Sequence, residues 1–132
     1  MGYGIEFDHE RKLIVFRSYG RVDLRQLIEA FRTTARHPDF DPRYHTLCDF
    51  RELKDIALLP QELLPLLMEM KSADRREGRT AIIVGDNREH LSMARVFEKL
   101  ADSLLQNPHQ VFEDPVEAEV WLGVRDMMAA LH

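Results

Sequence analysis

The chain has 132 residues, 45% of them hydrophobic, which suits one globular domain with a core of its own. Its net charge of −5 argues against a general nucleic-acid binder, because such a protein needs a clustered basic surface. The only cysteine is Cys48, which excludes a disulfide framework and a cysteine-rich metal site.

Nothing in the sequence indicates export or membrane insertion. The first ten residues, MGYGIEFDHE, are acidic and lack the apolar segment of a signal peptide. No apolar run approaches the ~18 to 20 residues needed to cross a bilayer. We therefore expect a cytoplasmic protein without a membrane span.

The N-terminal region reads as a β-hairpin. Residues 3–7 and 12–19 are short β-type runs joined by the polar stretch 8–11, and Gly20 is expected to end the second strand.

A first helix should follow the hairpin. Asp23 and Gln26 have the spacing of a capping box, and the helix is expected to run to about His37, before Pro38 and Pro42. Apolar residues recur behind the cap at helical spacing: Leu24, Leu27, Ile28, Phe31 and Ala35.

The middle of the chain predicts a strand, a helix and another strand. Residues 44–50 form the expected third strand, and residues 51–57 a loop. A helix over residues 61–76 should stop at Gly78. Residues 80–84 contain the continuous run Ala-Ile-Ile-Val, which is typical of a strand covered on both faces.

The last part predicts two helices around a short strand. Asp86 and Glu89 suggest a capping box for the third helix, and residues 110–112 suggest the fifth strand. A final capping box, formed by Asp114 and Glu117 with Pro115 at the first helical position, should start the last helix. Trp121 and Leu122 of that helix should face inward.

The predicted fold is therefore a single α/β domain over residues 1–132, in the order β-β-α-β-α-β-α-β-α. Strands that alternate with helices need crossover connections, so they should be parallel and their crossovers right-handed. One strand of the hairpin must then run against the rest. We expect a mixed sheet of about five strands with helices packed on it.

The sequence resembles the SpoIIAA-like group, which shares its architecture with STAS domains and anti-sigma-factor antagonists. The likeness covers nearly the whole chain, through IEFDHERKLIVFRSYGRVDL, YHTLCDFRELKDI, RTAIIVGDNREHLSMARVFEKLAD and QVFEDPVEAEVWL.

This resemblance implies a small regulatory or ligand-binding module. STAS-type proteins are non-catalytic regulators that bind protein partners, and some bind nucleotides or hydrophobic ligands. Antagonist members are switched by phosphorylation of a serine after the third strand. The corresponding stretch here, DIALLPQEL at residues 55–63, contains neither Ser nor Thr, so the phosphorylatable motif is lacking.

A candidate rim for a ligand or partner lies where two strands should end. Ligands of open α/β sheets favour the carboxyl ends of the strands. Arg51 and Arg88 could hold an anion jointly there, although surface ion pairs and plain turn and cap roles explain the same residues. Gly85 lacks the further glycines of a Rossmann or P-loop motif. The candidate rim residues are Asp49, Arg51, Gly85, Asp86, Asn87 and Arg88.

The sequence nominates no catalytic residue, metal ligand or cofactor. The six histidines show no metal-ligand spacing, and no G-x-S-x-G elbow is present. His45 and Cys48 should point to opposite faces of a strand, so Cys48 is expected to be a core residue. An enzyme that uses Asp49, Arg51 and Arg88 remains an open alternative.

The segment ALLPQELLPLLMEM, residues 57–70, is apolar around most of its helical circumference. Pro65 should lie in the first turn, with regular helix beginning near Glu62. Three interpretations stay open: deep burial, a protein interface such as a homodimer, or the wall of a site for a hydrophobic ligand. The candidate interface residues are Leu58, Leu59, Leu63, Leu66, Leu67 and Met70.

Our leading hypothesis from the sequence is a non-catalytic regulatory or interaction module that self-associates through the 57–70 helix. The alternative is a carrier or sensor of a small hydrophobic or amphipathic molecule, bound under the same helix near Asp49 and Gly85.

Overall fold

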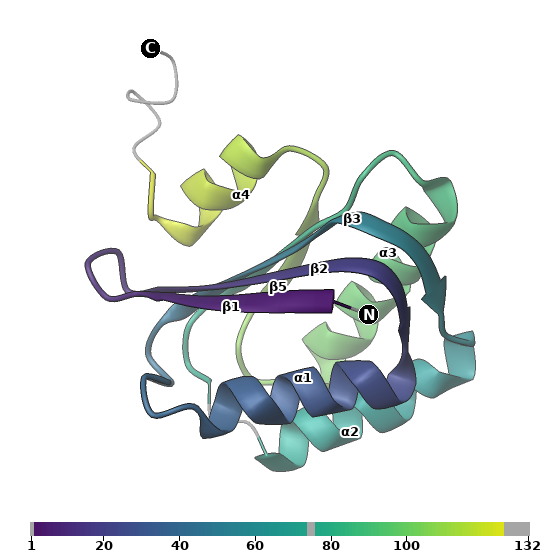
Figure 1. The fold of residues 1–132 in the computed structure, drawn as a ribbon, viewed down its shortest axis with the longest axis horizontal. Helices are drawn as coiled ribbons and strands as arrows, with labels where there is room; N and C mark the ends of the chain where they lie inside the picture. Colours follow the sequence, from purple (N-terminus) through teal and green to yellow (C-terminus); the bar gives the residue numbers. More distant parts are fainter. Residues whose placement is uncertain (1, 74–75, 126–132) are drawn as a thin grey trace.

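A five-stranded mixed sheet forms the centre of the structure, with helices on both of its faces (Figure 1). The structure is a computed structural model that describes residues 2–73 and 76–125. The elements in chain order are β1 (Gly2–Asp8), β2 (Leu13–Asp23), α1 (Leu24–Arg36), β3 (His45–Ala57), a 3-10 turn (Pro60–Glu62), α2 (Leu63–Ala73), β4 (Thr80–Ile83), α3 (Arg88–Leu104), β5 (His109–Phe112) and α4 (Pro115–Leu122). The predicted fold class and element order are confirmed.

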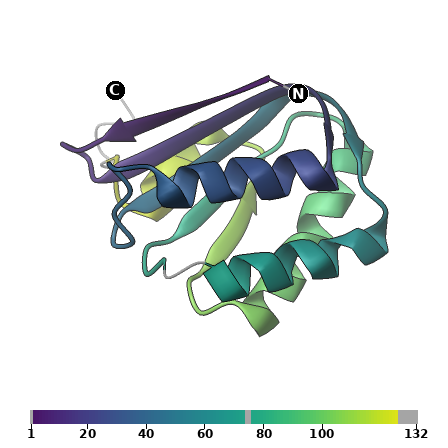
Figure 2. The ribbon, with the colours of Figure 1, turned by 60° about the horizontal axis from the view of Figure 1, so that its bottom comes forward.

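The strands lie in the sheet in the order in which they occur in the chain. β1 is antiparallel to β2, and β2 to β5 are mutually parallel. Because crossovers are right-handed and the strand order never reverses, α1, α2 and α3 must lie on one face. Figures 1 and 2 show these three helices on that face, which we call the helix face, and α4 on the other, the α4 face.

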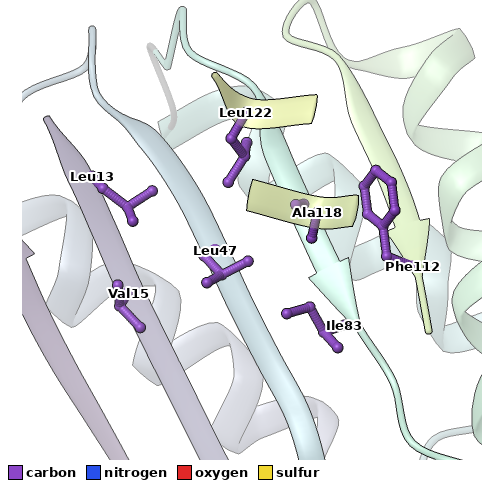
Figure 3. Packing of buried hydrophobic residues seen from close by; sticks show 8 residues of the cluster. Leu13, Val15, Leu47, Ile83, Phe112, Ala118 and Leu122 are labelled. Carbon is purple, nitrogen blue, oxygen red and sulfur yellow. The ribbon is translucent and has the colours of Figure 1, made fainter. Parts of the chain in front are cut away.

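The α4 face has a compact core. Leu47 and Ile83 from the central strands pack there against Ala118 and Leu122 of α4 (Figure 3). Trp121 of α4 also packs on this cluster, and its ring lies 5.6 Å from the ring of Phe112. Leu122 is buried, as predicted, and Trp121 is half-buried.

The helix face carries two linked groups of apolar residues. One joins the helices to one another, with Phe31 of α1, Leu67 of α2 and Ala101 of α3 at its centre. The other packs Ile82 and Val111 of the sheet against α3. The helices thus form a separate layer over this face of the sheet.

Two strands are longer than predicted. β2 continues through Gly20 to Asp23, and β3 continues through residues 51–57, which we expected to form a loop. Gly20 has a φ of 81°, and the register between β2 and β3 shifts beside it. The glycine therefore allows a bulge and does not end the strand, since an irregular residue bends a ladder without breaking its pairing.

Three of the four helix starts agree with the sequence, since Asp114 also caps α4 ahead of Pro115, and one differs. The capping box of Asp23 and Gln26 is present, and Pro65 lies in the first turn of α2. The box expected from Asp86 is wrong, because Asn87 caps α3 by accepting hydrogen bonds from the N–H groups of Glu89 and His90. The predicted end of the second helix falls partly on residues 74 and 75, outside the described residues.

Candidate ligand-binding cavity

A cavity of about 140 Å³ lies between the helix face of the sheet and α1, α2 and α3. Its floor is formed by β2, β3, β4 and the start of β5, and its roof by all three helices. The lining is almost entirely apolar, and comprises Phe16, Val22, Leu27, Ala30, Phe31, Thr34, Thr46, Cys48, Phe50, Leu53, Ile56, Leu58, Leu63, Leu66, Met70, Arg76, Thr80, Ile82, Val84, Met93, Ala94, Phe97 and His109.

Small side chains in the roof help to explain why no side chain fills this space. Ala30 of α1 and Ala94 of α3 line the cavity, and each ends at a Cβ atom. Larger side chains would fill the same positions, since protein interiors are otherwise packed to crystal density. A void of ~150 Å³ with comparable apolar walls holds benzene in another protein, which sets the size of molecule that fits.

One end of the cavity carries polar side chains in a row across the sheet. Thr46 pairs in register with Thr80, and Thr80 pairs in register with His109. Residues that pair in register on neighbouring strands point to the same side of the sheet, so these three lie side by side on the helix face. All three are at the start of their strands, and all three line the cavity.

Thr46 is the least satisfied member of this row. Its side chain is only 2% exposed, and its Oγ1 has no hydrogen-bond partner among the residues that the structure describes. Thr80 Oγ1, by contrast, accepts a hydrogen bond from the Asn107 side-chain amide at 3.3 Å. A buried polar atom without a partner costs free energy that a ligand could recover.

Arg76 brings a positive charge to the same end. It precedes β4 in the chain, and its guanidinium carbon lies 5.0 Å from the ring centre of Phe31 and 5.5 Å from that of Phe40. Its charge acts on His109, whose imidazole pKa is lowered by burial and, to a lesser degree, by Arg76. Arg76 is the one permanently charged side chain among the described lining residues.

Cys48 lies in the floor of the cavity, where its thiol is expected to be unreactive. Burial raises the pKa of its thiol to about 11, so that the reactive thiolate is scarce at neutral pH. His45 is on the other side of the strand, where its Nδ1 accepts a hydrogen bond from the Arg79 N–H at 2.9 Å. The two side chains are separated by the sheet, as the alternation along a strand requires.

The candidate rim residues do not line the cavity. Asp49 alternates with Cys48 and so lies on the α4 face, where both of its carboxylate oxygens accept hydrogen bonds from Arg51, at 2.9 and 2.7 Å. That pairing lowers the pKa of the Asp49 carboxyl and neutralises one of the two arginines that could have held an anion, in line with the surface ion-pair explanation. Gly85 does lie beside Arg51, since a Cβ at residue 85 would be 3.4 Å from the Arg51 carbonyl oxygen.

The remaining rim residues surround the start of α3. Asn87 is its cap, and Asp86 and Arg88 are exposed on either side of it. Their placement next to the end of β4 was predicted, but the space that could hold a ligand is under the helices.

The candidate interface residues are mostly inside the protein. Leu63, Leu66, Leu67 and Met70 are buried against the rest of the chain, and they are therefore unable to form a surface. Leu58 lines the cavity and is half-buried, so Leu59 alone of the six is exposed. Among the described residues of α2, the exposed large hydrophobic side chains are Leu64 and Met68, which were not among the predicted interface residues.

The burial of the leucine-rich segment agrees with one of its three open interpretations, and its place in the cavity lining leaves the ligand-site interpretation as a proposal. The segment is deeply buried, and it forms one wall of the cavity through Leu58, Leu63, Leu66 and Met70. None of the described helices is both long and apolar enough to cross a membrane. Within residues 2–73 and 76–125, no group of three or more potential metal-ligating side chains occurs.

Comparison with known structures identifies the fold. No protein-family model matches the sequence, and no curated protein matches it significantly. A crystal structure of an uncharacterised protein of the DUF3478 family from Shewanella loihica PV-4, described as having a SpoIIAA-like fold, is similar over 92% of each chain, with 20% identity and a TM-score of 0.56. The unphosphorylated anti-sigma factor antagonist SpoIIAA is more distant, with 15% identity over 92% of this chain and 98% of that one, and a TM-score of 0.47. The chain has a SpoIIAA-like fold.

Proposed function

We propose that this SpoIIAA-like domain is a non-catalytic carrier or sensor of a small, largely apolar molecule, which it binds in the cavity under α1, α2 and α3. The observation that carries the proposal is the cavity itself, because an apolar void of about 140 Å³ is larger than the packing defects of an ordinary small domain.

The expected affinity follows from the size of the site. Burying a CH₂-sized group contributes about 0.8 kcal/mol, so a ligand of six carbons gains roughly 5 kcal/mol. That gain corresponds to a Kd on the order of 0.1 to 1 mM. Additional polar contacts at the Thr46 end would be needed for tighter binding.

The lining favours binding over chemistry. Its only thiol, Cys48, is held in the protonated form by burial, and Thr34 donates its hydroxyl to the carbonyl oxygen of Ala30 at 2.9 Å. An enzyme built on Asp49, Arg51 and Arg88 is a weaker alternative, because Asp49 and Arg51 are paired with each other and Arg88 is exposed at the start of α3.

Titration with toluene, followed by amide NMR shifts, tests the proposal. We expect saturable shifts in the unmodified protein and none in Ala94→Leu, because the added carbons would occupy the cavity. Ser92→Leu is the matched control, since it adds the same side chain at an exposed position of α3. Equal binding by all three proteins, or no binding by any, would contradict the proposal.

A second candidate function is self-association through the outer side of α2. Leu64 and Met68 are 50% and 49% exposed and are four residues apart, so they lie together on the helix surface. Leu59, which is 56% exposed, precedes the same helix. Stable interfaces bury ~800 Å² per partner, and three side chains supply less than that, so we expect a weak dimer at most.

Light scattering during size exclusion tests this second candidate. Leu64→Glu should shift any dimer to monomer, whereas Val96→Glu, at an exposed position of α3, should leave the mass unchanged. A monomer at every concentration would rule out self-association.

A further inference from the structure

We propose that the ligand is a small carboxylic acid whose apolar part fills the cavity and whose carboxylate lies at the Thr46 end. This inference deepens the proposed function and rests on it. The relevant observation is the meeting of an unsatisfied buried hydroxyl and a cation at one end of an otherwise apolar space.

The position of the polar end follows from the strand register. Thr46 of β3 pairs with Thr80 of β4, and Thr80 pairs with His109 of β5. Each is at the beginning of a parallel strand, whereas Phe50 and Val84 are about four residues further along the same two strand paths. At a rise of ~3.3 Å per residue, the polar row and the far apolar wall are about 13 Å apart along the strands.

Thr46 supplies a hydrogen-bond donor that the protein does not use. Its Oγ1 is out of contact with solvent and, within the described part of the chain, has no hydrogen-bond partner. A hydroxyl in this state donates readily to an incoming oxygen, because the cost of its desolvation has already been met on folding.

Arg76 selects the charge of that incoming group. Its guanidinium lies over the rings of Phe31 and Phe40, and it lines the cavity that Thr46 also lines. Stacking on two rings restricts the side chain, so less conformational entropy is lost when a ligand binds. A carboxylate matches a guanidinium in charge and in planar geometry.

Thr80 Oγ1 and His109 Nδ1 each have a hydrogen-bond partner, whereas Thr46 Oγ1 has none among the described residues, so Thr46 is the specific contact that we assign. The Thr80 hydroxyl accepts from Asn107, and His109 Nδ1 lies 2.9 Å from the Asn107 carbonyl oxygen. Asn107 is itself buried and also donates to the Gly78 carbonyl oxygen at 3.0 Å. This network fixes the start of β4 and β5, and with it the place of the polar end.

The experiment compares benzoate with toluene, which share an aromatic ring and differ in the carboxylate. Binding is followed by NMR titration of the full chain at neutral pH. We expect the protein to bind benzoate about tenfold or more tightly than toluene, the range of a charge-assisted hydrogen bond. Benzoate, unlike toluene, should also shift the ring resonances of His109, which is next to the site.

Two variants locate the carboxylate. Thr46→Val removes the hydroxyl with little change of shape, and Arg76→Gln removes the charge; each should lose the preference for benzoate. Arg25→Gln is the matched control, because Arg25 is exposed on α1 in an ion pair with Glu29. It should keep the preference.

The two proposals fail in different ways. If toluene binds and benzoate binds no better, or if both variants keep the preference, the carboxylate inference is wrong and the apolar site stands. If neither probe binds, the proposed function is wrong as well.

Discussion

Gly78 lies directly against the backbone of Tyr44. A Cβ atom at residue 78 would be 2.2 Å from the Tyr44 carbonyl oxygen, a distance that no real side chain tolerates. This contact brings the segment before β4 against the segment before β3, and so aligns the two strands whose first residues include Thr46 and Thr80.

We therefore predict that Gly78→Ala destabilises the protein by more than ~2 kcal/mol, since the clash is with backbone and requires the strands to move apart. Urea denaturation measures the loss. Gly4→Ala is the control, because a Cβ there would meet nothing within 4 Å. Equal stability of the two variants would show that β3 and β4 are not held this closely.

Thr46→Val should stabilise the ligand-free protein by about 1 kcal/mol, because it replaces an unsatisfied buried hydroxyl with a methyl group of similar size. Thr80→Val is the matched comparison in the adjacent strand. It should destabilise by about 1 kcal/mol, since the Asn107 amide would lose an acceptor. Both values come from urea denaturation, and the same sign for both would argue that the two hydroxyls have similar surroundings.

The Cys48 thiol should react slowly in the folded protein. Burial raises its pKa to about 11, so at pH 8 almost all of it is the unreactive thiol. Alkylation with iodoacetamide, followed by mass spectrometry, should be much slower in buffer than in denaturing urea. Equal rates would mean that the helix layer opens readily over Cys48.

Stability should fall as the pH is lowered through the histidine range. Burial lowers the pKa of His109 and of His45 in the folded state, below their ordinary value of 6.5. Between the folded and unfolded pKa values the unfolded chain binds more protons, so acid favours unfolding there and stability is recovered above about pH 6.5. The charged groups that face His109 include Arg76 and three residues of α3. Those three line a surface hollow together with His109, and they are Glu98, Lys99 and Asp102.

The decisive comparison is the slope of unfolding free energy against pH in the unmodified protein and in His109→Gln. The variant should show the smaller slope between pH 5 and 7, an interval set by the ordinary histidine pKa of about 6.5. An unchanged slope would mean that His109 titrates alike in the folded and unfolded chain.

Much of the fold could be predicted because the signals are local. The capping box at Asp23, the proline at residue 115 and the apolar run 80–84 each act within a few residues. The extension of β2 and β3 could not be predicted, since a glycine such as Gly20 is typical of the end of a strand. Only pairing with a distant strand shows that it forms a bulge instead.

The site was harder to predict than the fold. The sequence offered, as an alternative, a ligand site under the leucine-rich helix near Asp49 and Gly85. The cavity lies under that helix without either residue in its lining, and its polar end depends on which residues pair across β3, β4 and β5. Nothing local marks Thr46 as unsatisfied or Arg76 as part of the lining. The cavity itself depends on two small residues, Ala30 of α1 and Ala94 of α3, which both line it. Their helices come together only in the tertiary structure.

Four of the six candidate interface residues lie inside the protein for a related reason. Leu63, Leu66, Leu67 and Met70 were selected because the segment has more apolar side chains than one face of a surface helix needs. In the structure α2 packs against both α1 and α3 as well as covering the cavity, so these residues are used inside the protein. The large apolar side chains of the segment that remain exposed are Leu59, Leu64 and Met68.

The most direct test of the central claim is an NMR measurement of through-space contacts between bound toluene and protein methyl groups. We expect contacts to Ile82, Val84 and Leu66, which line the cavity, and none to Leu47 or Ile83 on the α4 face of the same strands. Absence of binding, or contacts confined to Leu47 and Ile83, would contradict the account.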